Sequence, residues 1–241
     1  MCNRIYLSWQ SQNDRSWHVV GRLDQSQGKY RFVYTKGATH SKFLPLVGMS
    51  DLYKQYESDY LFPVFENRLL STKRPEYQKF IRWLDLDVES VNALDVLARS
   101  EGRKATDQFQ VFPDLTAVNG RLEVCFFVHG TSHMEDADSI ISSVRENEKL
   151  LLQPYPENPA DKKAVLVCAD NPYRKLGYLP RYLASVMSDF IQQSPELVDI
   201  RLKKISSDAP VYYQLLCSMV CDVSGLPNQQ IKLSEEYQPV V

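Results

Sequence analysis

The sequence predicts an α+β fold built in two parts, and three observations support this prediction. Three short aromatic-rich stretches near the start have the composition of strands, and a block of amphipathic helical segments follows them. A second strand-rich block begins after Asn119-Gly120, a dipeptide typical of hairpin turns. We therefore expect a small α+β domain over 1–118, an antiparallel β domain with one packed helix over 119–224, and a polar tail over 225–241.

The first part is expected to be a strand meander followed by helices. Strands are expected at residues 5–9, 17–23 and 30–35. Helices are expected at residues 61–69, 76–84 and 88–100. Leu61, Phe65 and Leu69 fall on one helical face, and Pro75 suits the start of the second helix.

The second part is expected to be mostly β-structure. Strands are expected at residues 122–128, 150–153, 164–168, 176–179, 198–202 and 211–223. One amphipathic helix is expected at residues 181–192, where Leu183, Val186, Met187 and Phe190 form a stripe. We see no internal repeat and no low-complexity tract.

Composition excludes some classes of function. The chain has 28 Lys and Arg against 30 Asp and Glu, so its net charge is −2 and any phosphate binding must come from a local patch. The five cysteines form no CxxC pair, and His129 and His133 are not accompanied by further ligands, so no metal site is expected. Residues 1–20 lack an apolar signal segment and no membrane span is expected, which predicts a cytoplasmic location.

Sequence signatures of common enzymes are also missing. The chain has no GxxxxGK[ST] loop, no GxGxxG loop and no GxSxG nucleophile elbow. We therefore expect a protein that is not an enzyme and that uses no cofactor, although an unrecognised enzyme stays open as a third interpretation.

The most distinctive local pattern lies between the expected strands at 150–153 and 164–168. Asn158-Pro159 favours a fixed turn, because the residue before proline is driven out of the helical region. Asp161 can accept hydrogen bonds from the amides of the same turn. On these local features alone, a well-made hairpin loop with no further role is the preferred interpretation.

Three separated motifs then form a recognisable series. They are Phe127-Val128-His129-Gly130-Thr131-Ser132-His133, Asn158-Pro159-x-Asp161-x-x-Ala164-Val165 and Leu176-Gly177-Tyr178-Leu179-Pro180-Arg181. In this order they resemble the core pattern of HIRAN domains, over about residues 121–222. In eukaryotic fork-remodelling ATPases, HIRAN domains are OB-like barrels that hold the 3′ end of single-stranded DNA. The resemblance therefore implies an antiparallel OB-like β-barrel with a packed helix and a non-catalytic, DNA-binding role.

The same resemblance implies roles for individual residues. Ser132 and His133 take the positions of residues that touch the DNA end, and Asn158 and Asp161 line the pocket, with the Asp161 carboxylate accepting from a 3′-hydroxyl. Tyr178 and Arg181 form the opposite wall, for stacking and for phosphate. Lys162 and Lys163 are expected to contribute positive charge nearby. A core tyrosine and an ordinary charge at a helix start are the alternatives for Tyr178 and Arg181.

Two departures from the family pattern predict weak binding. Ala160 stands where the animal DNA-end binders have an aromatic residue for base stacking. Residues 120–225 contain 11 Lys and Arg against 14 Asp and Glu, which gives a net charge of −3.

The first part resembles the small N-terminal subdomain of HipA-type toxin kinases. The resemblance lies in Val20-Gly21-Arg22-Leu23, Leu44-Pro45-Leu46 and a run from Phe62 to Leu70 that contains Asn67. In that family the subdomain packs beside a kinase and holds no catalytic residue, and no kinase signature follows here.

Two functions of different class stay open. The chain is either a module that binds single-stranded DNA or a DNA 3′ end, with a regulatory N-terminal domain, or an antitoxin-like adaptor that docks on a partner enzyme such as a kinase, helicase or nuclease. A groove that gathers Lys162, Lys163, Arg174, Lys175 and Arg181 favours the first, and a broad apolar surface favours the second.

Overall fold

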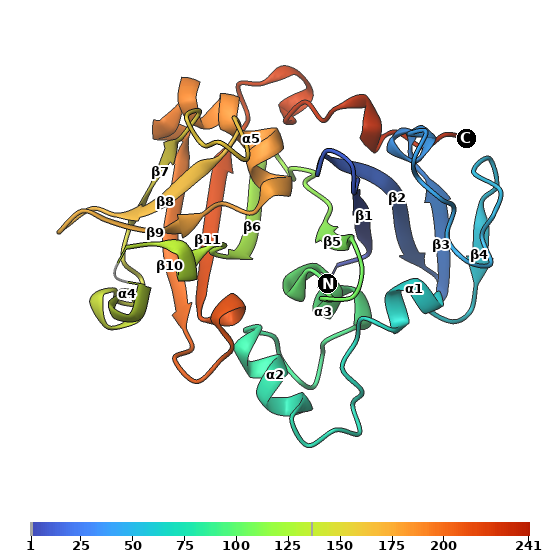
Figure 1. Ribbon diagram of the computed structural model, residues 1–241, viewed down its shortest axis with the longest axis horizontal. Helices are drawn as coiled ribbons and strands as arrows, with labels where there is room; N and C mark the ends of the chain where they lie inside the picture. Colours follow the sequence, from blue (N-terminus) through green and yellow to red (C-terminus); the bar gives the residue numbers. More distant parts are fainter. Residues whose placement is uncertain (1, 136) are drawn as a thin grey trace. The chain divides into compact units, whose positions relative to one another are not determined.

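The computed structural model describes residues 2–135 and 137–241, and the chain divides into two compact units (Figure 1). Unit 1 contains the residues up to Asp114 together with Leu233–Val241, and unit 2 contains Leu115–Lys232. The chain therefore leaves unit 1, forms unit 2 and returns. The segment predicted as a polar tail, 225–241, is divided between the two units.

Unit 1 is built on one antiparallel sheet with strand order β4-β3-β2-β1-β5. Its strands are β1 (Arg4–Gln10), β2 (Trp17–Ser26), β3 (Lys29–Tyr34), β4 (Tyr56–Ser58) and β5 (Phe109–Pro113). One face of the sheet carries the core, which includes Ile5, Leu7 and Phe32. The strands β4 and β5 were not expected from the sequence.

Three short helices follow the meander: α1 (Pro63–Glu66), α2 (Tyr77–Trp83) and α3 (Ala93–Ser100). The third begins five residues later than expected. The reason is a capping box, in which the Asn92 side chain accepts from the Asp95 amide while the Asp95 carboxylate accepts from the Asn92 amide. Glu101 has a φ of 61°, which ends the helix.

The last nine residues are held on the sheet of unit 1. Tyr237 is buried and its ring packs edge-on against Tyr6, with ring centroids 5.1 Å apart. An isolated bridge joins Thr35 to Pro239, and the Val240 amide donates to the Tyr34 carbonyl. This segment is therefore part of the core of unit 1, because an aromatic side chain in a polar sequence supplies an anchor.

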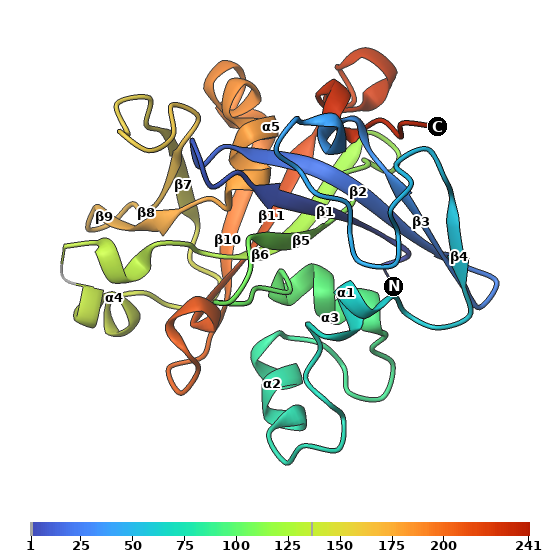
Figure 2. The ribbon, with the colours of Figure 1, turned by 45° about the vertical axis from the view of Figure 1, so that its right-hand side comes forward.

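Unit 2 contains two antiparallel three-stranded sheets, with orders β10-β11-β6 and β7-β8-β9 (Figures 1 and 2). Its strands are β6 (Arg121–Phe127), β7 (Leu150–Pro154), β8 (Val165–Ala169), β9 (Arg174–Tyr178), β10 (Val198–Ile205) and β11 (Leu215–Asp222). Its α-helices are α4 (Ala137–Ser143) and α5 (Arg181–Gln193). All five residues of β8 are buried, and the apolar stripe of α5 includes Leu183, Met187 and Ile191.

The barrel of unit 2 is not closed, so the structure agrees only in part with the expected OB-like barrel. In the described part of the chain, single bridges join the two sheets, one between His129 and Tyr178 and one between Lys149 and Arg201. The strands part at these two edges because left-handed residues turn the chain, Gly130 with a φ of 68° after β6 and Asn147 with a φ of 67° before β7. The result is a pair of antiparallel three-stranded sheets with incomplete closure.

None of the helices in residues 2–135 and 137–241 has the length and apolar character of a membrane span.

Candidate nucleic-acid interface

The loop from 155 to 164, between β7 and β8, is held by its own polar groups. The Asn158 side-chain oxygen accepts from the amides of Ala160, at 2.9 Å, and Asp161, at 3.2 Å. The Asp161 carboxylate accepts from the Lys163 amide at 3.0 Å, and the Asp161 carbonyl accepts from the Ala164 amide. These are the local bonds that Asn and Asp make in turns, so the loop is preorganised.

Asp161 and Arg181 form an ion pair that joins this loop to the first residue of α5. The Arg181 Nε donates to Asp161 Oδ2 at 2.7 Å, and Nη2 donates to the Ala160 carbonyl at 2.8 Å. The two side chains stay partly exposed, 33% for Arg181 and 24% for Asp161. The family resemblance implied that Asp161 and Arg181 lie on opposite walls of a pocket, whereas the structure places them in direct contact.

Tyr178 lies at the edge where the two sheets meet. Its backbone amide and carbonyl pair with those of His129, at 2.8 and 2.9 Å, and its side chain is half-buried. Two glycines allow this approach. A Cβ on Gly130 would lie 3.1 Å from the Tyr178 ring, and a Cβ on Gly177 would clash with the His129 carbonyl oxygen.

Ser132 and His133 follow Gly130 in a short 3₁₀ helix, Thr131–His133. Both side chains are exposed, and Thr131 is buried beneath them. Because Gly130 contacts Tyr178, the turn brings this helix beside the end of β9. Within the described residues, His129 and His133 are not part of any cluster of three or more side chains that could hold a metal ion.

The basic residues near the loop are not gathered into one groove. Lys163 is directed to α5, where its ammonium donates to the Ser185 carbonyl at 3.1 Å and lies 3.9 Å from Asp189. Lys162 is exposed. Lys175 lies over the Tyr155 ring, 5.9 Å from its centroid, and Arg174 is directed elsewhere.

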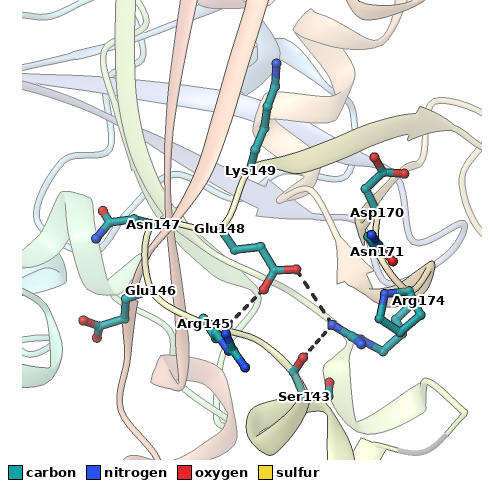
Figure 3. Close-up of a pocket in the computed structure, with 10 residues that line it drawn as sticks. Ser143, Arg145, Glu146, Asn147, Glu148, Lys149, Asp170, Asn171 and Arg174 are labelled. Atoms are coloured by element: carbon teal, nitrogen blue, oxygen red, sulfur yellow. Dashed lines mark hydrogen bonds and ion pairs between the residues drawn. The ribbon is translucent and has the colours of Figure 1, made fainter.

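Arg174 instead lines a pocket of about 720 Å³ that the sequence did not predict (Figure 3). Its Nη2 donates to the Ser143 carbonyl at 2.5 Å and lies 3.8 Å from the Glu148 carboxylate, which also accepts from the Arg145 amide. Figure 3 shows Asp170 and Asn171 on the side of Arg174. Three cations and three carboxylates line the pocket, so it has no excess charge for an anion. No local pattern links residues 143–149 to 170–174, so this pocket could not be predicted from the sequence.

Comparisons with known proteins agree with the motif order. The HIRAN domain family model matches residues 122–224. A crystal structure of a protein from Lactobacillus plantarum is 19% identical, covers 42% of this chain and 96% of its own, and has a TM-score of 0.33. The crystal structure of the HIRAN domain of human HLTF is 20% identical, covers 49% of this chain and 96% of its own, and has a TM-score of 0.33. No curated protein matches the chain.

The similarity of residues 1–118 to HipA-type kinases stays a prediction. For the second part, the family match and the three motifs agree in position and order. Residues 122–224 therefore form a HIRAN domain.

Proposed function

We propose that the HIRAN domain binds single-stranded DNA at a free 3′ end, that it does so without catalysing a reaction, and that unit 1 has a regulatory role. The observation that carries this proposal is the contact between Asp161 and Arg181 on a preorganised loop. A carboxylate oxygen has two lone pairs, so Asp161 keeps acceptor capacity for a terminal hydroxyl beside its bonds to Arg181 and the Lys163 amide. The outer part of the Arg181 guanidinium can contact the last phosphate.

This arrangement predicts a preference for a 3′-hydroxyl over a 3′-phosphate. A terminal phosphate would bring a second negative charge to the Asp161 carboxylate, whereas a hydroxyl can donate to it. A hydrogen bond to a charged group contributes about 1.5–3 kcal/mol, which corresponds to a preference of roughly 10- to 150-fold. Affinity should be low overall and should fall with salt, by about 0.7 log units of affinity per log unit of salt for each neutralised phosphate.

The test is a titration of labelled single strands that end in a 3′-hydroxyl or a 3′-phosphate. Asp161→Asn should remove the preference, and Arg181→Ala should weaken binding to both strands. Arg121→Ala is the matched control, because this arginine is exposed on β6 and paired with Glu123. Equal affinity of the unaltered protein for the two ends would refute end recognition.

A second candidate function is the adaptor, and an observation in unit 1 favours it. Four large apolar side chains are strongly exposed within residues 44–60: Leu44, Val47, Tyr53 and Tyr60. If these side chains form one contiguous surface, that surface is of the kind that binds another protein. Co-purification of a kinase, helicase or nuclease that is lost on Leu44→Ser with Val47→Ser would support the adaptor, and unchanged co-purification would refute this surface.

A further inference from the structure

The outward face of the β7-β8-β9 sheet carries tyrosines and lysines that the end site does not use. Alternation along β7 places Lys149, Leu151, Gln153 and Tyr155 on one face, because successive side chains of a strand point to opposite sides. Lys149 and Gln153 are exposed and Leu151 is 40% exposed. We call these residues, together with Tyr173 and Lys175, the tyrosine face.

Contacts across the sheet join the two sides of the tyrosine face. The Tyr173 hydroxyl donates to the Gln153 side-chain oxygen at 2.9 Å, and Lys175 lies over the Tyr155 ring. Tyr173 remains 52% exposed and Lys175 is also exposed. The two rings are therefore fixed in orientation, with Tyr173 open to solvent and Tyr155 half-buried.

The charge of the tyrosine face suits a polyanion. Its six residues include two lysines and no carboxylate. Next to Lys149, the bridge to β10 brings Arg201, and the same side of β10 carries Lys203. Asp199 is paired with Arg201 at 3.1 Å, and Lys149 and Lys175 are the two cations of the face itself. Asp170, in the adjoining turn, lines the pocket together with Arg174 and Lys149, so Lys149 lies between the pocket and the tyrosine face.

We infer that the tyrosine face is a second nucleic-acid contact, on which bases of a single strand stack on Tyr155 and Tyr173 while Lys149 and Lys175 contact phosphates. Tyrosine rings with interspersed lysines give this kind of binding with little dependence on sequence. From Lys149 to Tyr155 the strand spans about 20 Å, which suits several nucleotides.

This inference extends the proposed function without depending on its end site. The loop that carries Asn158 and Asp161 begins at Tyr155, and the Asn158 amide donates to the Tyr155 carbonyl. A strand whose 3′ end reaches Asp161 can therefore continue toward the tyrosine face. A circular strand has no end and can use the tyrosine face alone, so circles separate the two sites.

The experiment measures binding of linear and circular oligothymidine to the full chain. Tyr155→Ala with Tyr173→Ala should lower affinity for circles about tenfold or more, since a stacked base contributes about 1–3 kcal/mol. Tyr155→Phe with Tyr173→Phe should keep most of the affinity, because the rings remain. Tyr53→Ala with Tyr60→Ala is the matched control in unit 1 and should bind as the unaltered chain does.

Additional variants show whether a negative result concerns the tyrosine face or the end site. Asp161→Asn should abolish the preference for a 3′-hydroxyl and leave circles bound, whereas the alanine pair at 155 and 173 should lose circles and keep that preference. Lys175→Gln, at an exposed position, tests the face if the alanine pair does not fold.

Three results would overturn the inference. The first is that the unaltered chain does not bind circular strands. The second is that the folded alanine pair and Lys175→Gln bind circles as tightly as the unaltered chain does. The third is that a protein partner needs the two tyrosines for binding while circular strands do not.

Discussion

Replacement of Arg68 by alanine should destabilise unit 1 strongly, although this residue takes no part in the proposed binding. The Arg68 side chain is only 2% exposed. Its Nε donates to the Val64 carbonyl at 2.9 Å, Nη1 donates to the Gly102 carbonyl at 2.8 Å, and Nη2 pairs with Asp107 at 2.5 Å. The guanidinium therefore joins α1 to the segment that leads into β5.

The expected loss follows from these contacts. Asp107 is 30% exposed, so the main cost comes from the two backbone carbonyls that accept from the guanidinium, and a hydrogen bond to a charged group contributes about 1.5–3 kcal/mol. The Val64 and Gly102 carbonyls would each lose a donor, and the Phe109 ring would lose the cation 5.7 Å from its centroid. We therefore expect the free energy of unfolding of unit 1 to fall by about 3–5 kcal/mol.

The assay is urea unfolding followed by tryptophan fluorescence. All three tryptophans, Trp9, Trp17 and Trp83, belong to unit 1, so the signal reports on that unit alone. Arg31→Ala is the control, because Arg31 is 45% exposed and its pair with Glu57 should contribute about 0–1 kcal/mol. A loss below about 1 kcal/mol for Arg68→Ala would refute the reasoning.

Three further predictions concern buried groups. Tyr34→Phe should cost about 1–3 kcal/mol, since the hydroxyl accepts from the Leu46 amide and donates to the Met49 carbonyl. Burial raises the pKa of Tyr34 to about 12, so stability is complete below pH 10 and falls as the pH rises toward 12; an alkaline titration of the Phe variant should lack this part of the fall. Burial raises the pKa of Cys221 to about 12, so this thiol should not react with an alkylating reagent at pH 8 while the chain is folded. Mass spectrometry should find Cys221 unmodified and the half-exposed Cys125 modified. Equal labelling of the two cysteines would contradict this prediction. Tyr237→Ala should lower the stability of unit 1 by about 3 kcal/mol in the tryptophan assay, and an unchanged urea midpoint would contradict the anchoring role of the last nine residues.

The sequence predicted correctly those strands and helices whose own residues show a clear apolar periodicity. The strand β2 and the helix α5 form where alternation and a four-residue stripe place them. The strand β5 was missed because its sequence, FQVFP, ends in proline and is a strand only through pairing with β1. Tyr237 reaches Tyr6 across almost the whole chain, and no local pattern can show such a contact.

At the candidate site, too, local features could be predicted from the sequence and tertiary contacts could not. Motif order placed Asn158, Asp161 and Arg181 in one region, and the turn bonds of Asn158 follow from its residue type. The pairing of Asp161 with Arg181 depends on where α5 begins relative to the loop, which is a tertiary feature. The tyrosine face was missed because Tyr155 follows β7 and Tyr173 precedes β9, and the two share a face only once the hairpin registers are set.

Unit 2, which contains the HIRAN domain, is a continuous segment whose two ends are held together. The Gln230 side chain accepts from the Ala117 amide at 2.9 Å and donates to the Ala117 carbonyl at 2.8 Å, so a single amide group satisfies both backbone groups. A domain with adjacent ends can be inserted in another without opening either core, since the host chain leaves and returns at one place. Here the returning segment completes the sheet surface of unit 1 through Tyr237 and Pro239. Folding of unit 1 therefore requires the chain segments on both sides of unit 2. A break in the chain within unit 2 would separate the last nine residues from the rest of unit 1.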